Sequence, residues 1–463
     1  MALQPRGPTP SKGGLRPLPQ VVVTAAQTPS ALNVLKPSKV AKADKPAPPQ
    51  DTRWRWHWLL AAPHRLGFFA GAMMLVASAL WWCLHLVAQS AQVALPWAVT
   101  PGLAHGATMS LGFMPLFFVG FLFTAGPKWL GVPEPGARAL LPQVAGYLVS
   151  WALALLGFHT SHLLAATGLA GVALMWSALV WKFAYLWWYS RSPDKAHATV
   201  VVIACTVGAL ALWVSAIGMA LELEAVVRSA VYAAIWLFVA TVFAAVSHRM
   251  IPFFSASALP VLDAWRPMWL LWSMVGILWF EGVFAVLDLW VWPFPEALRW
   301  LQVAVEAPAA VLMLWLAIRW GLVQSLKIRL LAMLHGGFVW LGIALALQAV
   351  SHALMALSQH QLSLGLAPLH AMTMGYLGAT LFAMATRVAS GHSGRPLAAD
   401  NMAWALYWVA QLAVLLRVVS ALWPTAGNLP LLLAIGAWTL ATCGWSLRYG
   451  SWFGRPRVDG RPG

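Results

Sequence analysis

The chain has 463 residues, of which 61% are hydrophobic and only 9% are charged, and its formal net charge is +16. Soluble globular domains carry roughly a quarter charged residues, so this composition excludes an ordinary water-soluble protein. The apolar residues form blocks of about 20, the length that an α-helix needs to cross a hydrocarbon core of about 30 Å. We therefore expect an all-α, polytopic integral membrane helical bundle.

The first 65 residues differ from the rest of the chain. The segment "SKVAKADKPAPPQDTR" (38–53) is rich in Pro, Lys and Ala and has no apolar periodicity. Such a segment cannot bury enough surface to offset the entropy of ordering it. We expect residues 1–65 to be a disordered basic cytoplasmic tail, 66–450 a membrane domain of about twelve helices, and 451–463 a short basic C-terminal tail.

Hydropathy, with Pro, Gly and charged residues marking the ends of segments, predicts twelve membrane spans. The predicted limits are 66–88, 103–126, 138–157, 162–188, 197–219, 226–246, 267–291, 297–322, 328–349, 366–387, 402–423 and 427–447.

The basic residues predict the orientation of these spans. Nearly all of the 29 lysines and arginines lie in the two tails or in the even-numbered connections. The exceptions are Arg228, Arg299 and Arg417. This asymmetry predicts that both termini are cytoplasmic. A basic cytoplasmic face that meets anionic lipid also explains the net charge, so we expect no nucleic-acid partner.

Two of the thirteen histidines stand out by their depth in the membrane. His105 opens the second predicted span and His370 lies one turn into the tenth, and both of these spans run from the outside to the inside. Ionisable groups within spans are costly and tend to face a cavity or a cofactor. Two rings at matched depth on different helices predict axial ligands on either side of a metal macrocycle. Histidines in loops, such as His159 and His360, are expected to be ordinary polar surface residues.

Two residues close to His105 have alternative interpretations. Met109 lies one turn away and is either a second possible ligand or a packing residue. Gly112 lies two turns away, roughly 10 Å along a helix, where the absence of a side chain lets a flat ring approach the backbone. Its alternative is close helix–helix packing through small residues.

Three charged residues lie inside predicted spans, in their outer halves: Glu281, Glu306 and Arg417. Arg417 either neutralises a haem propionate or pairs with one of the glutamates. We favour the pairing, because carboxylates in membranes commonly find internal partners.

Several stretches in order along the chain resemble the NnrS family of bacterial membrane proteins. They are "HGATMSLGF" and "GFLFTAGPKWLG" (within 105–131), "HRMIPFFS" (248–255), "LHGGFVWLG" (334–342) and "LHAMTMGYLGATLFAMATRVASGHSGRPL" (369–397). The likeness covers roughly residues 60 to 450, and the segment "HRMIPFFS" is expected to be a cytoplasmic connection. The resemblance implies haem b, copper, a bacterial inner (plasma) membrane location and a role in the response to nitric oxide and nitrosative stress. Nitric oxide and an electron donor are then the expected partners besides lipid and haem.

One departure from the family pattern concerns copper. The family often has a histidine and a glutamate directly after the first histidine, where this chain has Ala107 and Thr108. The ligand position at His105 is kept, but a metal role of the missing pair cannot be carried over. The copper expectation is therefore weaker than the haem expectation.

Two other functions remain open. Histidines on the second and tenth of twelve helices are also similar to the low-spin haem site of haem-copper oxidases, which suggests a quinol-linked reductase. However, the sixth and seventh spans lack a histidine cluster for copper, and Pro368 replaces a further haem ligand. A transporter without a redox cofactor is the other alternative, since Pro115 and Pro308 lie within spans where they could break helices around a site. We find no internal repeat between the two halves.

Overall fold

The computed structural model describes residues 53–461, and these belong to one unit that comprises residues 50–463. Most of the predicted tail, residues 1–65, therefore lies outside the described residues. Within the part that is described, the short 3-10 helix η1 (Trp56–Leu60) precedes the first long helix, which begins at Pro63. The backbone N–H of Arg55 donates to the carbonyl of Gly454, so this segment contacts the end of the chain.

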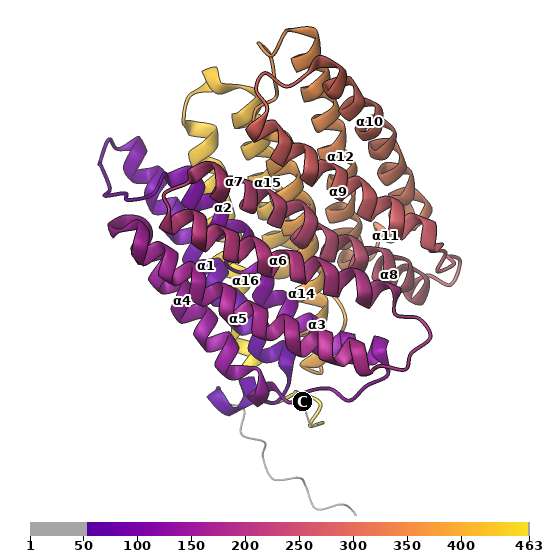
Figure 1. Ribbon diagram of the computed structural model, residues 1–463. Helices are drawn as coiled ribbons and strands as arrows, with labels where there is room; N and C mark the ends of the chain where they lie inside the picture. Colours follow the sequence, from indigo (N-terminus) through magenta and orange to yellow (C-terminus); the bar gives the residue numbers. More distant parts are fainter. Residues whose placement is uncertain (1–52, 462–463) are drawn as a thin grey trace, which may run out of the picture. The chain divides into compact units, whose positions relative to one another are not determined.

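Helices account for nearly all of the described unit (Figure 1). The first half contains α1 (Pro63–Ser90), α2 (Pro101–Leu111), α3 (Met114–Leu130), η2 (Ala137–Ala139), α4 (Leu141–Thr160), α5 (His162–Tyr189), α6 (Ala196–Ala220), α7 (Glu224–Ala233), η3 (Ala234–Ala240) and α8 (Thr241–Ala258). The second half contains α9 (Met268–Trp290), α10 (Glu296–Arg319), α11 (Leu322–Ser325), α12 (Arg329–Leu357), α13 (Ala367–His370), η4 (Ala371–Gly378), α14 (Ala379–His392), α15 (Asn401–Leu422), η5 (Pro424–Ala426) and α16 (Leu429–Phe453).

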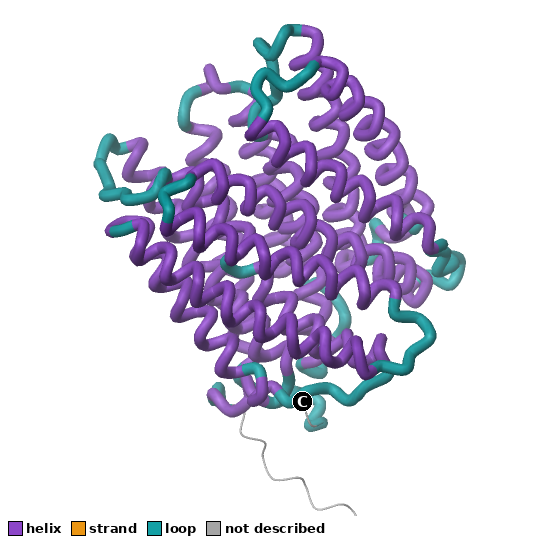
Figure 2. Tube along the Cα trace, in the orientation of Figure 1, coloured by secondary structure: helices purple, strands orange, loops and turns teal. Residues whose placement is uncertain are grey.

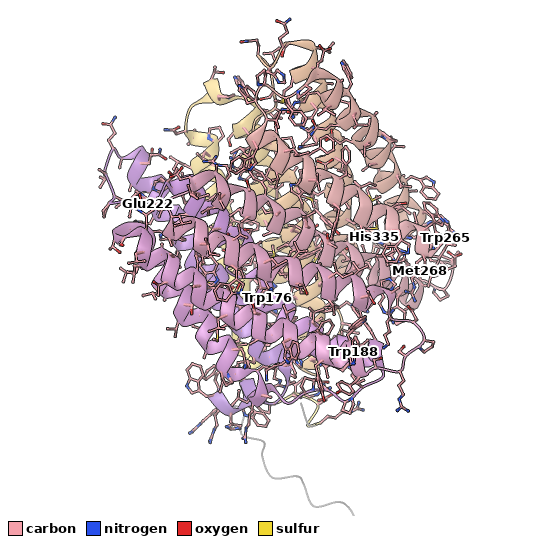
Figure 3. The ribbon with its side chains drawn as sticks, viewed as in Figure 1. Trp176, Trp188, Glu222, Trp265, Met268 and His335 are labelled. Carbon is pink, nitrogen blue, oxygen red and sulfur yellow. The ribbon has the colours of Figure 1, made fainter. Side chains whose placement is uncertain are left out.

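The long helices run side by side, and most of the connections lie at the two ends of the bundle (Figure 2). Glu222, after α6, and Trp188, near the end of α5, mark these opposite ends (Figure 3). Trp188 is 73% exposed and Trp292 is 68% exposed. Exposed tryptophans at helix ends are typical of rings that lie at the level of the lipid headgroups. The helical membrane fold predicted from composition is thus confirmed.

Eleven helical segments of the described residues are long and apolar enough to cross a membrane, one fewer than the twelve predicted spans. The predicted tenth span, 366–387, is helical from Ala367 to His392 but is not among the eleven. It carries polar side chains that are buried in protein, including Tyr376, Thr380 and Thr386. A helix that is shielded from lipid by its neighbours does not need an apolar surface, so hydropathy alone underestimates it.

The segment "HRMIPFFS" (248–255) differs from the expectation, because it is part of α8 and not a connection. The polar residues Ser247, His248 and Arg249 end the hydropathy signal, but the helix continues past them to Ala258. Pro252 lies inside this helix, and proline is tolerated in membrane helices where neighbouring groups satisfy the freed carbonyl. Several other predicted spans are also longer in the structure, among them α12 and α16.

A candidate cofactor cavity between helices

A cavity of about 360 Å³ lies between α1, α2, α7, η3, the α13–η4 segment, α15 and α16. Its walls are mainly apolar, and a small number of polar side chains reach it. Ligand pockets in proteins have volumes of about 300–1,000 Å³ and this same mixed lining. His105, His370, Met109 and Arg417, four of the five residues predicted for the site, line this one cavity.

Irregular helix geometry surrounds the cavity. The first histidine helix ends at Leu111, and the next helix, α3, begins at Met114 with Pro115 in its first turn. The π-helices η3 and η4 both contribute to the wall, η3 through Ile235 and Val239. Segments of π-helix are rare and are frequently found at functional sites.

His370, the last residue of α13, has one ring nitrogen committed to its own helix. Its Nδ1 lies 2.9 Å from the carbonyl oxygen of Leu366. A carbonyl oxygen can only accept, so Nδ1 carries the hydrogen and donates it, and Nε2 of the neutral ring keeps its lone pair. A backbone carbonyl that holds the far nitrogen in this way is the usual support of a metal-ligating histidine.

Among the described residues, His105 contacts an aromatic ring and makes no side-chain hydrogen bond. The indole of Trp82, from α1, stacks on the imidazole with ring centroids 4.0 Å apart and an interplanar angle of 24°. Nδ1 of His105 is buried and has no hydrogen-bond partner among the described residues. A buried polar group without a partner costs about 1–3 kcal/mol, so this ring is incompletely satisfied by the protein residues around it.

The structure supports packing as the role of Gly112, the fifth predicted site residue. Gly112 is not part of the cavity lining. A Cβ atom at this position would lie 2.9 Å from Cε of Met74, on the neighbouring helix α1. This contact favours packing, and a close approach of a flat ring at Gly112 stays a prediction.

Arg417 does not pair with Glu281 or Glu306. Its guanidinium Nη1 donates to Oγ of Ser420, 3.2 Å away, and it makes no ion pair within the described part of the chain. The favoured expectation of a glutamate partner is therefore wrong. Glu306 instead contacts His352 of α12, whose Nδ1 lies 2.8 Å from Oε1 of Glu306.

Arg228 and Trp82 are cavity residues that the sequence analysis did not select. Arg228 lies on α7, and like Arg417 it lines the cavity. The sequence did contain a signal for Arg228, because this arginine is one of the few basic residues that depart from the expected cytoplasmic distribution. No sequence signal distinguishes Trp82 from the other tryptophans near helix ends.

Ligands for copper are a separate question. Within residues 53–461 the structure brings together no group of three or more His, Cys, Asp or Glu side chains that could hold a metal ion. Ala107 and Thr108 are buried in the helix that carries His105.

Comparison with known families identifies the chain. The family model described as NnrS protein matches residues 58–457, which is nearly the whole described structure. This chain belongs to the NnrS family. No curated protein matches it. All of the elements that line the cavity lie within the matched residues.

Proposed function

We propose that this NnrS protein holds a b-type haem in the cavity, with His105 and His370 as axial ligands, in the bacterial inner membrane. We further propose that it acts in the response to nitric oxide and nitrosative stress, as the family membership suggests. The observation that carries the proposal is that two histidines from helices far apart in sequence line the same cavity.

The chemistry of the donor set fits haem iron. Neutral imidazole nitrogen is a common axial ligand of haem iron. His370 is held in the required tautomer by the carbonyl of Leu366, and His105 has no other hydrogen-bonding role in the described structure. Met109 lies one turn from His105 in the same wall and contributes a thioether to the apolar lining.

The two arginines fit the acidic edge of the same group. Haem carries two propionates, and Arg228 and Arg417 both reach the cavity without an ion-pair partner in the described residues. An intramembrane cation is costly unless an anion compensates it. These two side chains would hold the propionates and thereby orient the ring between the histidines.

A bound haem supplies one-electron redox chemistry and, where an axial position is free, binding of a diatomic gas. The chain's own residues bind and orient this group, and the apolar wall limits access of water to it. His105 and His370 would both hold the haem iron, and the group so held would supply electron transfer. The described residues offer no comparable ligand set for copper.

The test is the absorption spectrum of the purified protein from haem-replete cells. We expect a Soret band that sharpens on reduction, and its loss or strong perturbation in the His105→Ala and His370→Ala variants. His159→Ala and His360→Ala are matched controls that keep the band. His159 bonds to Trp81 and to the carbonyl of Pro96, and neither control residue lines the cavity.

A colourless wild-type protein would overturn the haem proposal and favour a transporter. Unchanged spectra in both cavity variants would show that the haem is bound elsewhere.

A further inference from the structure

A second buried polar cluster joins α9, α10 and α12 and does not line the haem cavity. Its members are Glu281 of α9, Arg299, Gln302 and Glu306 of α10, and His352 of α12. Each is at most 5% exposed. Polar groups this deeply buried in a membrane protein are costly and commonly serve proton or ion pathways.

The hydrogen bonds assign a protonation state to His352. Nη1 of Arg299 donates to Oε1 of Gln302 over 3.1 Å, which fixes the orientation of that amide. The amide nitrogen of Gln302 therefore faces Nε2 of His352, 3.4 Å away. Nε2 then accepts, and the ring is neutral with its hydrogen on Nδ1.

Glu306 accepts the hydrogen bond that Nδ1 of His352 donates. Nδ1 of His352 lies 2.8 Å and 3.0 Å from the two carboxylate oxygens of Glu306. An ionised carboxylate has no hydrogen of its own and accepts through both oxygens, which fits this contact, and we therefore assign Glu306 as the ionised form. The guanidinium of Arg299 adds a favourable charge on the same helix, although its ion-pair partner is Asp288.

Glu281 completes the cluster as a protonated acid. Its carboxyl group is in hydrogen-bonding contact with that of Glu306, and its Oε1 has no partner in the described structure. Two buried carboxylates in contact cannot both ionise, because desolvation and mutual repulsion act together. Since Glu306 is the ionised member, Glu281 carries the proton.

The groups that face this carboxyl pair come from few elements. α10 contributes Arg299 and α12 contributes His352, while Asp288 of α9 belongs to the ion pair with Arg299. On α7, Tyr232 lies within electrostatic reach of Arg228. Tyr232 also lies within electrostatic reach of Asp288. The π-helix η3, "AIWLFVA", carries no titratable residue.

The helix that carries Glu281 packs against a wall of the cavity. A Cβ atom on Gly282, next to Glu281, would lie 2.9 Å from Cβ of Trp236 and 2.7 Å from Cδ2 of Leu237. Both of these belong to η3, and Ile235 and Val239 of the same segment line the cavity. The segment η3 thus lies between α9 and the cavity.

We propose that Glu281 and Glu306 form an intramembrane proton-binding site, in which Glu281 stores one proton and Glu306 takes up a second when an electron enters the cavity. The proton uptake by Glu306 rests on the proposed function, whereas the proton storage by Glu281 does not. The electron comes from a one-electron reductant and the proton from solvent. The Glu306 carboxylate becomes a carboxylic acid, so the pair of sites gains no net charge.

Infrared spectroscopy of the full-length protein tests both steps. The oxidised wild type is expected to show a carboxylic acid C=O band that shifts in D₂O and is lost in Glu281→Gln. Reduction with dithionite is expected to add a second carboxylic acid band, which is absent in Glu306→Gln. Glu296→Gln is the matched control, because Glu296 is an exposed carboxylate on the same helix α10.

The glutamine variants keep the shape and hydrogen-bonding capacity of glutamate, and a monodisperse elution profile with an unchanged Soret band shows that they are folded. Identical carboxylic acid regions in the wild type and Glu281→Gln would overturn the stored proton. Carboxylate bands that shift when Na⁺ is exchanged for K⁺ would also overturn the stored proton. They would indicate that the two glutamates bind a cation.

The absence of any new carboxylic acid band on reduction of a haem-loaded wild type would overturn the coupled uptake. Absence of haem would instead contradict the proposed function, and the band that Glu281 contributes would still be measurable.

Discussion

Arg228, Arg299 and Arg417 are the basic residues that depart from the expected cytoplasmic distribution, and each lies at a polar site within the bundle. Arg228 and Arg417 line the cavity, and Arg299 orients Gln302 in the second cluster. An arginine away from the cytoplasmic face has no stabilising contact with anionic headgroups there. The position of such an arginine therefore indicates that it has an anionic partner, which belongs either to the protein or to a bound ligand.

Arg417 provides a prediction at this scale. Arg417→Leu removes a positive charge from the cavity wall, so adding an electron there becomes less favourable and the midpoint potential of the haem proposed above is expected to fall. At an effective dielectric constant of about 20 the effect is roughly 1–2 kcal/mol, which corresponds to about 40–80 mV for one electron. A redox titration followed at the Soret band measures the shift.

Arg417→Lys keeps the charge and is expected to change the potential much less. Equal potentials in the wild type and the leucine variant would show that Arg417 does not face the redox group.

At the scale of single helices, small residues determine where neighbouring helices approach. A Cβ atom on Gly67 of α1 would lie 2.4 Å from the backbone nitrogen of Gly120 of α3. The contact is backbone against backbone, so no flexible side chain can move aside. The helix that follows His105 is thus held against α1 by a pair of glycines, as is typical of membrane helix packing.

Gly67→Ala is expected to destabilise the protein by about 1–3 kcal/mol, because an added methyl group overpacks a tight interface. Gly276→Ala on α9 is the matched control, since a Cβ atom there meets nothing within 4 Å. Alanine is also the better helix former, so the control is expected to be neutral or slightly stabilising. Thermal unfolding in detergent compares the two variants, and equal melting temperatures would contradict the close contact.

At the scale of the whole molecule, the segment Ala367–His392 decides how many times the chain crosses the membrane. It carries His370 and the π-helix η4, and it packs against α12. With this segment the described unit has twelve crossings and both of its ends on one side, as the hydrogen bond from Arg55 to Gly454 requires. Eleven crossings would place the ends on opposite sides.

Site-directed labelling distinguishes these cases. Ser363→Cys and Leu397→Cys place thiols in the exposed connections before and after the segment. If the segment crosses and the orientation follows the basic residues, a membrane-impermeant maleimide labels only the Ser363→Cys variant in intact cells. Both variants label after permeabilisation, and the unmodified chain gives the background from its own cysteines. Labelling of both in intact cells would rule out a crossing by this segment.

Much of the fold and part of the site were predictable from the sequence. Blocks of about 20 apolar residues determine membrane helices locally, because the hydrocarbon thickness sets their length. His105, His370 and Arg417 were predictable candidates because ionisable residues within apolar spans are rare.

The rotation and packing of the helices were decided only by the tertiary structure. Because of the packing, Arg417 lines the cavity and does not pair with Glu306. Glu306 hydrogen-bonds to His352. Gly112 lies against Met74. Hydropathy is nearly the same for every rotation of a largely apolar helix. Which polar side chains meet therefore depends on contacts between helices that are distant in the chain.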